Sequence, residues 1–414
     1  MTKSVYYRLN RSRYMHSLLA AGLFILPAIL CNTSIQASEL SDSLPESLQI
    51  HGFASQGFIE TSDNNFFGDS QNGGSFDYRE LGLNASLRPL PNLQLSAQIL
   101  SRTAGEGNNG DVRLDYGFAD YSFISNETNL LGLRLGRIKN PLGLYNDTRD
   151  VPFTRPTILL PQSIYFDRTR NLALSADGAQ LYGEHRMDSG NLSFQIGAVY
   201  PKADDLETEL AILGDNLPGK LEGDLSYIGR IIYERDGGRL RLALTGARVN
   251  ISYKPALAFP DDLLAGTNPF TPWILSAQYN AERWSLTAEY ALRSLKYKDF
   301  GIPDLSFTGE SYYLQGTYRF NPKWEAVLRY DVLYTDKDDR DGSDFAAATG
   351  LPAYNFFAKD FTVGLRWNIT PSFMLRGEYH RVNGTAWLPL LDNPNPADAT
   401  QHWNLFAIRA SYRF

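Results

Sequence analysis

The segment 284–293 reads WSLTAEYALR. Apolar residues occupy every second position from Trp284 to Leu292, and polar residues such as Ser285 and Glu289 fill most of the positions between them. Because successive side chains of a β-strand point to opposite faces, this two-residue period predicts a strand with one apolar and one polar face. A strand of about ten residues, tilted near 45°, matches the thickness of a membrane's hydrocarbon core.

The same alternation recurs along the chain and predicts sixteen strands. They are expected at 48–59, 76–88, 92–102, 113–124, 130–139, 173–184, 191–200, 224–234, 239–250, 272–280, 283–294, 308–320, 324–334, 360–369, 372–382 and 402–414. Two of them fit the alternation least well, because Asp120 lies in phase with two aromatic residues and Arg230 with two isoleucines. Fourteen and eighteen strands are therefore the alternatives.

The connections between these strands alternate in length. Short turns are expected at 89–91, 125–128, 185–190, 235–238, 281–282, 321–323 and 370–371, with eight long loops between them. This layout predicts an all-β fold, a transmembrane antiparallel β-barrel with short turns and both termini in the periplasm and long loops outside. A soluble β-sandwich or propeller is the alternative, but it would bury its apolar face and would not alternate its loop lengths.

The first 37 residues have the pattern of a signal peptide. Four basic residues within the first thirteen precede an apolar stretch at 18–30, which is too short to span a bilayer as a helix. Cleavage is expected after Ala37, so residues 38–414 would form a single outer-membrane barrel domain. A lipoprotein signal ending at Cys31 is the weaker alternative, because Leu30 is bulky where a small residue is expected.

Removal of this segment changes the chemistry of the chain. Cys31 is the only cysteine, so the mature protein would have neither disulfides nor thiol chemistry. Loss of the four cations takes the formal net charge from −7 to −11. No basic arm or stripe remains, which argues against a nucleic-acid partner.

The chain ends with Ile408, Ala410, Tyr412 and Phe414 on one face of the last expected strand. This strand resembles the terminal signature strand of Gram-negative outer-membrane porins, which the barrel-assembly machinery of that family recognises. The resemblance implies that the protein resides in the bacterial outer membrane, with lipid and lipopolysaccharide as its partners.

A second resemblance lies in the segment 133–143, which reads LRLGRIKNPLG. A strand of this kind that runs into a Pro-x-Gly turn is similar to the start of the third loop in the phosphate-selective porin superfamily of sixteen-stranded channels. The resemblance implies a pore with an inward-folded third loop, often assembled as a homotrimer. It does not extend to phosphate selectivity, because the lysine-rich ladder expected for that property is missing from the sequence.

The long segment at about 140–172 is the candidate constriction of such a pore. Four prolines stiffen it, and both signs of charge occur in it. Its apolar triplet 158–160 favours burial inside the barrel over an ordinary exposed loop, which is the alternative. The candidate constriction residues are Tyr145, Asp147, Arg149, Asp150, Arg155, Asp167, Arg168 and Arg170.

The alternation also assigns wall residues to the lumen. Eleven arginines and six carboxylates fall on the inward face, which predicts a mild preference for anionic or polyhydroxylated small solutes. The alternative is that the arginines pair with the carboxylates and only stabilise the wall. The principal pore-lining candidates are Arg102, Arg134, Arg293, Arg329, Arg366, Arg376, Glu289 and Glu378.

Other functions have weaker support in the sequence. A barrel hydrolase needs a positioned histidine and a nucleophile, and His380 beside Glu378 has no serine in a recognisable context, so no enzymatic activity is expected. An adhesin or receptor that binds partners through its loops remains an alternative to the porin. No cofactor is expected.

Two loops carry further patterns. The acidic run 336–344 does not fit an EF-hand, because that register places Lys337 at the first ligand position and Ala348 at the last. No metal site is expected there, and a looser divalent site that touches lipopolysaccharide is the alternative. The segment 204–213 has acidic residues at its start and is expected to be helical.

Overall fold

The computed structural model describes residues 47–256 and 264–414. The expected signal peptide, with Cys31 and the cleavage position after Ala37, lies outside the described residues. One compact unit extends from Gln49 to Phe414 and contains all of the strands described below.

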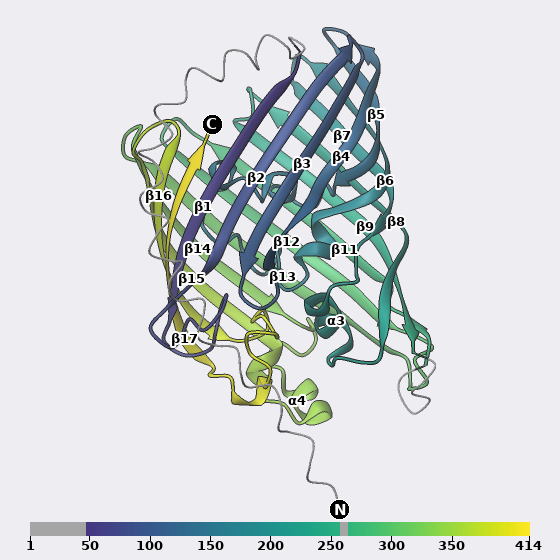
Figure 1. Ribbon diagram of the computed structural model, residues 1–414, viewed down its shortest axis with the longest axis vertical. Helices are drawn as coiled ribbons and strands as arrows, with labels where there is room; N and C mark the ends of the chain where they lie inside the picture. Colours follow the sequence, from purple (N-terminus) through teal and green to yellow (C-terminus); the bar gives the residue numbers. More distant parts are fainter. Residues whose placement is uncertain (1–46, 257–263) are drawn as a thin grey trace, which may run out of the picture. The chain divides into compact units, whose positions relative to one another are not determined.

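Sixteen long antiparallel strands form one closed sheet (Figure 1). They are β1 (Gln49–Thr61), β2 (Ser75–Leu90), β3 (Leu93–Ala104), β4 (Asn109–Ser125), β5 (Asn129–Lys139), β6 (Ser175–Met187), β7 (Gly190–Pro201), β8 (Gly219–Arg235), β9 (Leu240–Pro255), β11 (Phe270–Asn280), β12 (Trp284–Tyr297), β13 (Leu305–Arg319), β14 (Trp324–Tyr334), β15 (Phe357–Asn368), β16 (Phe373–Gly384) and β17 (His402–Arg413). β1 pairs with both β2 and β17, which closes the barrel, and the two-residue β10 (Gly266–Thr267) pairs with the end of β9. The predicted barrel and its count of sixteen are confirmed.

The period that predicted the strands also sets their two faces. On β12, the apolar side chains of Leu286 and Tyr290 are exposed on the outside, whereas Thr287, Glu289 and Arg293 are buried inside. This is the reverse of a soluble barrel and fits an outer surface that contacts lipid. Within the described residues, no helix is long and apolar enough to cross a membrane.

The alternation in β4 is poor for two reasons: Phe118 faces inward with Asp120, beneath Arg134, and a β-bulge interrupts the strand ahead of them. Gln98 of β3 is paired with Tyr116 while the next residue, Ile99, is paired with Leu114, so Asp115 is an extra residue in β4. Asp115 nevertheless points inward and accepts a hydrogen bond from Gln98 at 2.7 Å. An inserted residue puts two neighbouring side chains on one face, which breaks the two-residue period.

The apolar inward residues of β8 have a different cause. Ile228 packs with Ala247 and other buried residues against Leu142, and Ile232 packs against a second cluster that includes Leu144 and Tyr165. The inner face of β8 is therefore partly apolar because it is covered by the segment that follows β5.

The two ends of the barrel differ in their connections. At the end of the barrel where β17 finishes, short turns join β2 to β3, β4 to β5, β6 to β7, β8 to β9, β11 to β12, β13 to β14 and β15 to β16. The longer loops lie at the other end. Figure 1 shows α3 (Leu206–Leu213) and α4 (Ser343–Thr349) among these longer loops, so the predicted helix near 204–213 is confirmed. The expectation of eight long loops is wrong at one place, because only residues 105–108 connect β3 to β4.

The segment 140–174, here called the third loop, contains several short helical turns. These are η3 (Asn146–Thr148), η4 (Pro152–Thr154) and α2 (Arg170–Leu174). Outside it, η5 (Ala353–Phe356) and η6 (Pro396–Asp398) lie in the two last long loops. The apolar triplet 158–160 is buried, and Leu160 packs in one cluster with wall residues such as Ile274 and Tyr313.

Candidate functional site

The third loop contacts strands that are far apart around the barrel. Arg155 donates a hydrogen bond to Glu80 of β2 at 3.0 Å, and the Tyr165 hydroxyl donates to Glu289 of β12 at 2.6 Å. Around the closed sheet, eight long strands separate β2 from β12 in one direction and six in the other, so the loop crosses between opposite walls. The loop therefore lies among the inward-facing side chains of both walls.

A glycine allows the loop to turn inward directly after β5. Gly143 has a φ of 57°, and the next backbone N–H, that of Leu144, donates to the Tyr165 hydroxyl at 2.8 Å and to Glu289 at 3.0 Å. A Cβ at Gly143 would lie 2.5 Å from the Tyr165 hydroxyl oxygen and 2.8 Å from Glu289 Oε1. The Pro-x-Gly turn thus needs glycine both for its left-handed backbone and for this close approach.

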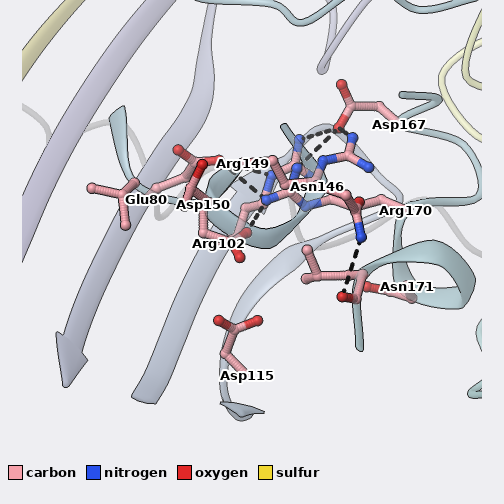
Figure 2. Close-up of polar contacts among 12 residues, drawn as sticks. Glu80, Arg102, Asp115, Asn146, Arg149, Asp150, Asp167, Arg170 and Asn171 are labelled. Carbon is pink, nitrogen blue, oxygen red and sulfur yellow. Dashed lines mark hydrogen bonds and ion pairs between the residues drawn. The ribbon is translucent and has the colours of Figure 1, made fainter. Parts of the chain in front are cut away.

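A cluster of buried charges joins the other side of the loop to β2, β3, β4, β5 and β17. Arg102 contacts Glu80 at 3.2 Å and Asp167 at 2.8 Å, and Figure 2 shows these groups converging with residues of the loop. We call this set the charge cluster. Its carboxylates are Glu80, Asp115, Asp150 and Asp167, and its cations are Arg102, Lys139, Arg149, Arg155, Arg170 and Arg409.

The loop members of the charge cluster keep their charges at neutral pH. Burial opposes ionisation of Asp150, but the adjoining Lys139 and Arg170 hold its pKa well below its usual range. Burial lowers the pKa of Arg149 to about 9, with a further contribution from Arg170. These loop residues therefore form fixed ionic contacts with the wall and do not titrate near neutral pH.

Most of the predicted wall residues bind the third loop. Arg293 donates to the Ser163 carbonyl at 2.6 Å and Arg329 donates to the Leu159 carbonyl at 3.0 Å. The residues placed between wall and loop in this way are Arg102, Arg293, Arg329, Arg376, Glu289 and Glu378. Each is buried, because the loop covers it.

Two of the predicted wall residues keep partial access to solvent. Arg134 pairs with Asp120 at 2.9 Å and its side chain is 28% exposed. Arg366 donates to Asn368 at 2.8 Å, lies 3.7 Å from Glu325 and is 23% exposed. The structure thus leaves these two side chains accessible to water.

The remaining predicted loop residues lie outside the charge cluster. Asp147 accepts a hydrogen bond from Arg230 at 3.2 Å, and the Tyr145 hydroxyl accepts one from Gln278 at 3.4 Å. Arg168 donates to the Ala386 carbonyl at 2.8 Å. In the part of the chain that the structure describes, Arg168 forms no ion pair.

Cavities remain on both sides of the third loop. At the short-turn end, a cavity of about 300 Å³ is mostly polar, and we call it the turn-side cavity. Its charged lining consists of Arg155, Arg283, Arg319, Arg366, Glu282 and Glu325. At the long-loop end, a cavity of about 290 Å³ is lined mainly by apolar and aromatic side chains.

The hydrolase alternative centred on His380, which lies inside a buried ionic group. His380 Nδ1 is 2.8 Å from Asp360 and 3.1 Å from the Thr362 hydroxyl, and its Nε2 is 3.5 Å from Glu378. Glu378 in turn accepts hydrogen bonds from the loop at Leu159. The arrangement holds the third loop, and the structure brings no serine to this imidazole among the hydrogen bonds of the described residues.

The acidic run 336–344 caps a short helix. Asp339 accepts from the Phe345 N–H at 3.0 Å, and Asp341 accepts from the Ser343 N–H at 3.2 Å. Among the described residues, no group of three or more His, Cys, Asp or Glu side chains is arranged to hold a metal ion.

Two members of the charge cluster were missed as site candidates from the sequence. Asp115 was missed because the bulge puts it out of phase with the lumen-facing residues of β4. Lys139 lies at the end of β5 and binds Asp115 at 2.6 Å. Its position shortly before the Pro-x-Gly turn was the feature of the sequence that could have identified Lys139 as a candidate.

Solved structures with the same architecture come from several bacteria. The outer membrane channel DcaP of Acinetobacter baumannii is 12% identical and has a TM-score of 0.59, covering 89% of this chain and 97% of its own. The fold is that of an outer-membrane porin. An anion-selective porin from Comamonas acidovorans is 13% identical with a TM-score of 0.52, covering 89% of this chain and 98% of its own.

OprB of Pseudomonas putida shares this porin fold at 9% identity, with a TM-score of 0.52 over 92% of this chain and 96% of its own. No protein family model and no characterised protein matches the chain by sequence. At these identities the similarity establishes the porin fold, and function has to be argued from the interior of this barrel.

Proposed function

We propose that the protein is a porin of the Gram-negative outer membrane that allows passive diffusion of small polar solutes, with a mild preference for anions. The observation that carries this proposal is the third loop, which is fixed across the interior by side chains of opposite walls. A barrel of sixteen strands encloses an aqueous channel, and an anchored internal segment narrows such a channel without closing it by movement.

The charges that line the turn-side cavity support the anion preference. Four arginines and two glutamates line it, and three of the arginines, Arg283, Arg319 and Arg366, lie outside the buried charge cluster. An excess of cations in a confined aqueous space attracts anions and repels cations. Arg134 and Arg366 are predicted wall residues that would act on a solute directly, whereas Arg376 and Arg329 would act by holding the loop.

We infer that lipid covers most of the outer surface and that a further copy of the chain covers part of it. Trp273, Leu275 and Ile196 are exposed on the outside, as lipid contact requires. On the outer face of β5 and β6, Arg137 donates two hydrogen bonds to Asp177, at 2.8 Å and 2.6 Å. An ion pair facing lipid is costly, so this face fits contact with a second copy, as in a homotrimer.

Liposome swelling tests the proposed diffusion. Vesicles that contain the refolded protein should swell in isotonic solutions of a small sugar such as arabinose and of a small organic acid such as lactate, and faster in lactate than in arabinose. Swelling no faster than in protein-free vesicles, for every solute, would contradict the proposal and favour a closed barrel that serves as a receptor. Cross-linking in native membranes tests the homotrimer separately, because a barrel that remains monomeric would exclude it.

A further inference from the structure

Three neighbouring cavities form a series at the long-loop end of the barrel, each sharing lining residues with the next. The outermost, of about 430 Å³, lies between α3, α4 and the last long loop, and the second, of about 290 Å³, lies inside the barrel mouth. They share lining residues that include Arg168, Tyr297 and Phe307. The second cavity in turn shares Phe166 and Arg293 with a third of about 80 Å³ beside the third loop.

The walls of this series are unusually apolar for a barrel interior. Phe307 packs edge-on against Phe345 at 5.2 Å between ring centroids and faces Tyr297 at 6.3 Å, so aromatic rings line the outer and second cavities. Phe270 and Leu333 continue the apolar lining inward. A porin lumen is normally polar, and the turn-side cavity of this barrel is polar in the same way.

Two guanidinium groups lie along the series without a carboxylate in direct contact, although Glu207 acts on Arg168 and Asp331 acts on Arg293 from a longer distance. Arg168 uses one N–H to bind the Ala386 carbonyl at 2.8 Å. Arg293 lies over the Phe166 ring at 4.5 Å and donates to the Ser163 carbonyl and to the Ser311 hydroxyl. Neither forms an ion pair within the described ranges 47–256 and 264–414. Each retains N–H donors beyond these bonds, because a guanidinium carries five.

An apolar wall with a cation that contacts no carboxylate selects a particular chemistry. A guanidinium removed from water is unfavourable when its nearest carboxylate is out of contact, and an arriving carboxylate can pair with it directly in a bidentate geometry. The aromatic wall meanwhile favours an apolar body over a sugar. Sugars and inorganic anions satisfy only part of this site.

We propose that this series of cavities binds amphipathic organic monocarboxylates, with a ring or a short alkyl chain against the aromatic wall and the carboxylate at Arg168 and then Arg293. This inference rests on the proposed porin function and names its substrate class. The solute would enter between α3 and α4, pass from one guanidinium to the other, and leave toward the turn-side cavity.

Binding of phenylacetate tests the proposal. In planar bilayers containing the full-length mature protein, phenylacetate in potassium chloride should interrupt the chloride current at concentrations at least tenfold below those of acetate. 2-Phenylethanol and 2-phenylethylammonium, which keep the ring but lack the carboxylate, should interrupt it no better than acetate. Equal potency of phenylacetate and acetate would overturn the proposal while leaving a conducting porin.

Two variants locate the site. Arg168→Gln should weaken the phenylacetate effect at least fivefold, and Phe307→Ala should weaken it while leaving the effect of acetate unchanged. The matched control is Arg186→Gln, which changes an exposed arginine that pairs with Glu184 near the end of β6. If both site variants behave like the control, the proposal is wrong.

If the protein conducts no current in any salt solution, the porin function is refuted. The proposed binding site can still be tested. Equilibrium dialysis of radiolabelled phenylacetate against the folded protein in detergent, with Arg168→Gln in parallel, serves this purpose. Saturable binding that the variant loses supports the site without the channel. No saturable binding overturns the site as well.

Discussion

Glu289 of β12 accepts the Tyr165 hydroxyl at 2.6 Å and the Leu144 N–H at 3.0 Å, and these bonds fix the centre of the third loop to the wall. The same carboxylate also receives the hydroxyls of Ser276 and Tyr313, at 2.6 Å and 2.9 Å. One buried carboxylate therefore accepts four donors from the wall and the loop.

Removing the Tyr165 hydroxyl should loosen the loop. Tyr165→Phe deletes a donor to Glu289 and the acceptor of two backbone N–H groups, at Leu144 and Tyr145. Loss of buried hydrogen bonds of this kind costs about 1–3 kcal/mol. We expect larger current fluctuations in single-channel records and a lower unfolding midpoint in urea. Current fluctuations no larger than those of the parent protein would show that Glu289 does not anchor the loop.

Neutralising Glu80 should be more damaging, because several cations share it. Glu80→Gln leaves Arg102, Arg155 and Arg409 without their common carboxylate. Removing one partner of a buried ion pair costs about 3–5 kcal/mol, since it leaves uncompensated charge. The measurement is the unfolding free energy in urea, and Glu184→Gln, in an exposed pair with Arg186, is the control. Equal, small losses in both variants would contradict the role of the charge cluster.

Arg366 and Arg376 should behave differently although both face inward on neighbouring strands. Arg366→Glu reverses a partly exposed charge in the turn-side cavity, and we expect it to shift the reversal potential toward cations with a stability change of no more than about 1 kcal/mol. Arg376→Glu removes donors to the Pro152 and Thr157 carbonyls, at 2.9 Å and 3.3 Å, and should mainly impair folding. If Arg376→Glu instead shifted the reversal potential with little loss of stability, and Arg366→Glu impaired folding, the third loop would not cover Arg376.

The last long loop should respond to pH through Asp392. Its carboxylate accepts the N–H groups of Phe67 and Glu106, at 3.0 Å and 2.9 Å, and so joins three loops. Burial raises the pKa of Asp392 from 3.8 to about 6. Because the joined loops bind the proton more tightly than separated loops do, their association is favoured as pH falls from about 6 toward 4.

Hydrogen exchange checks this pH dependence. Exchange rates at Phe67 and Glu106, corrected for intrinsic rates, should show more protection at pH 5 than at pH 7. Asp392→Asn should remove that difference. Greater protection at pH 7 than at pH 5 in the parent protein would mean that the ionised carboxylate is the favoured form.

Most of the barrel was predictable because a two-residue period is a local property of the sequence. Residues such as Leu286 and Glu289 reveal their opposite faces without any knowledge of neighbouring strands. The exception at Asp115 arose from a bulge, and a bulge depends on the partner strand, whose register the sequence does not display.

The interior was less predictable, for a different reason. The alternation placed Arg293, Arg329 and Arg376 on the inner face, but each binds a backbone carbonyl of the third loop. Backbone carbonyls are the same at every residue, so no sequence pattern shows which of them a distant arginine will meet. The count of inward charges consequently overstated how many would face a solute.

The reversal potential in a salt gradient tests the central proposal most directly. With the mature protein in a planar bilayer between two concentrations of potassium chloride, the current should be ohmic and the reversal potential should have the sign of chloride preference. Arg366→Glu should reduce its magnitude. A potential of the opposite sign, or no conductance at any concentration, would contradict a passive porin with anion preference.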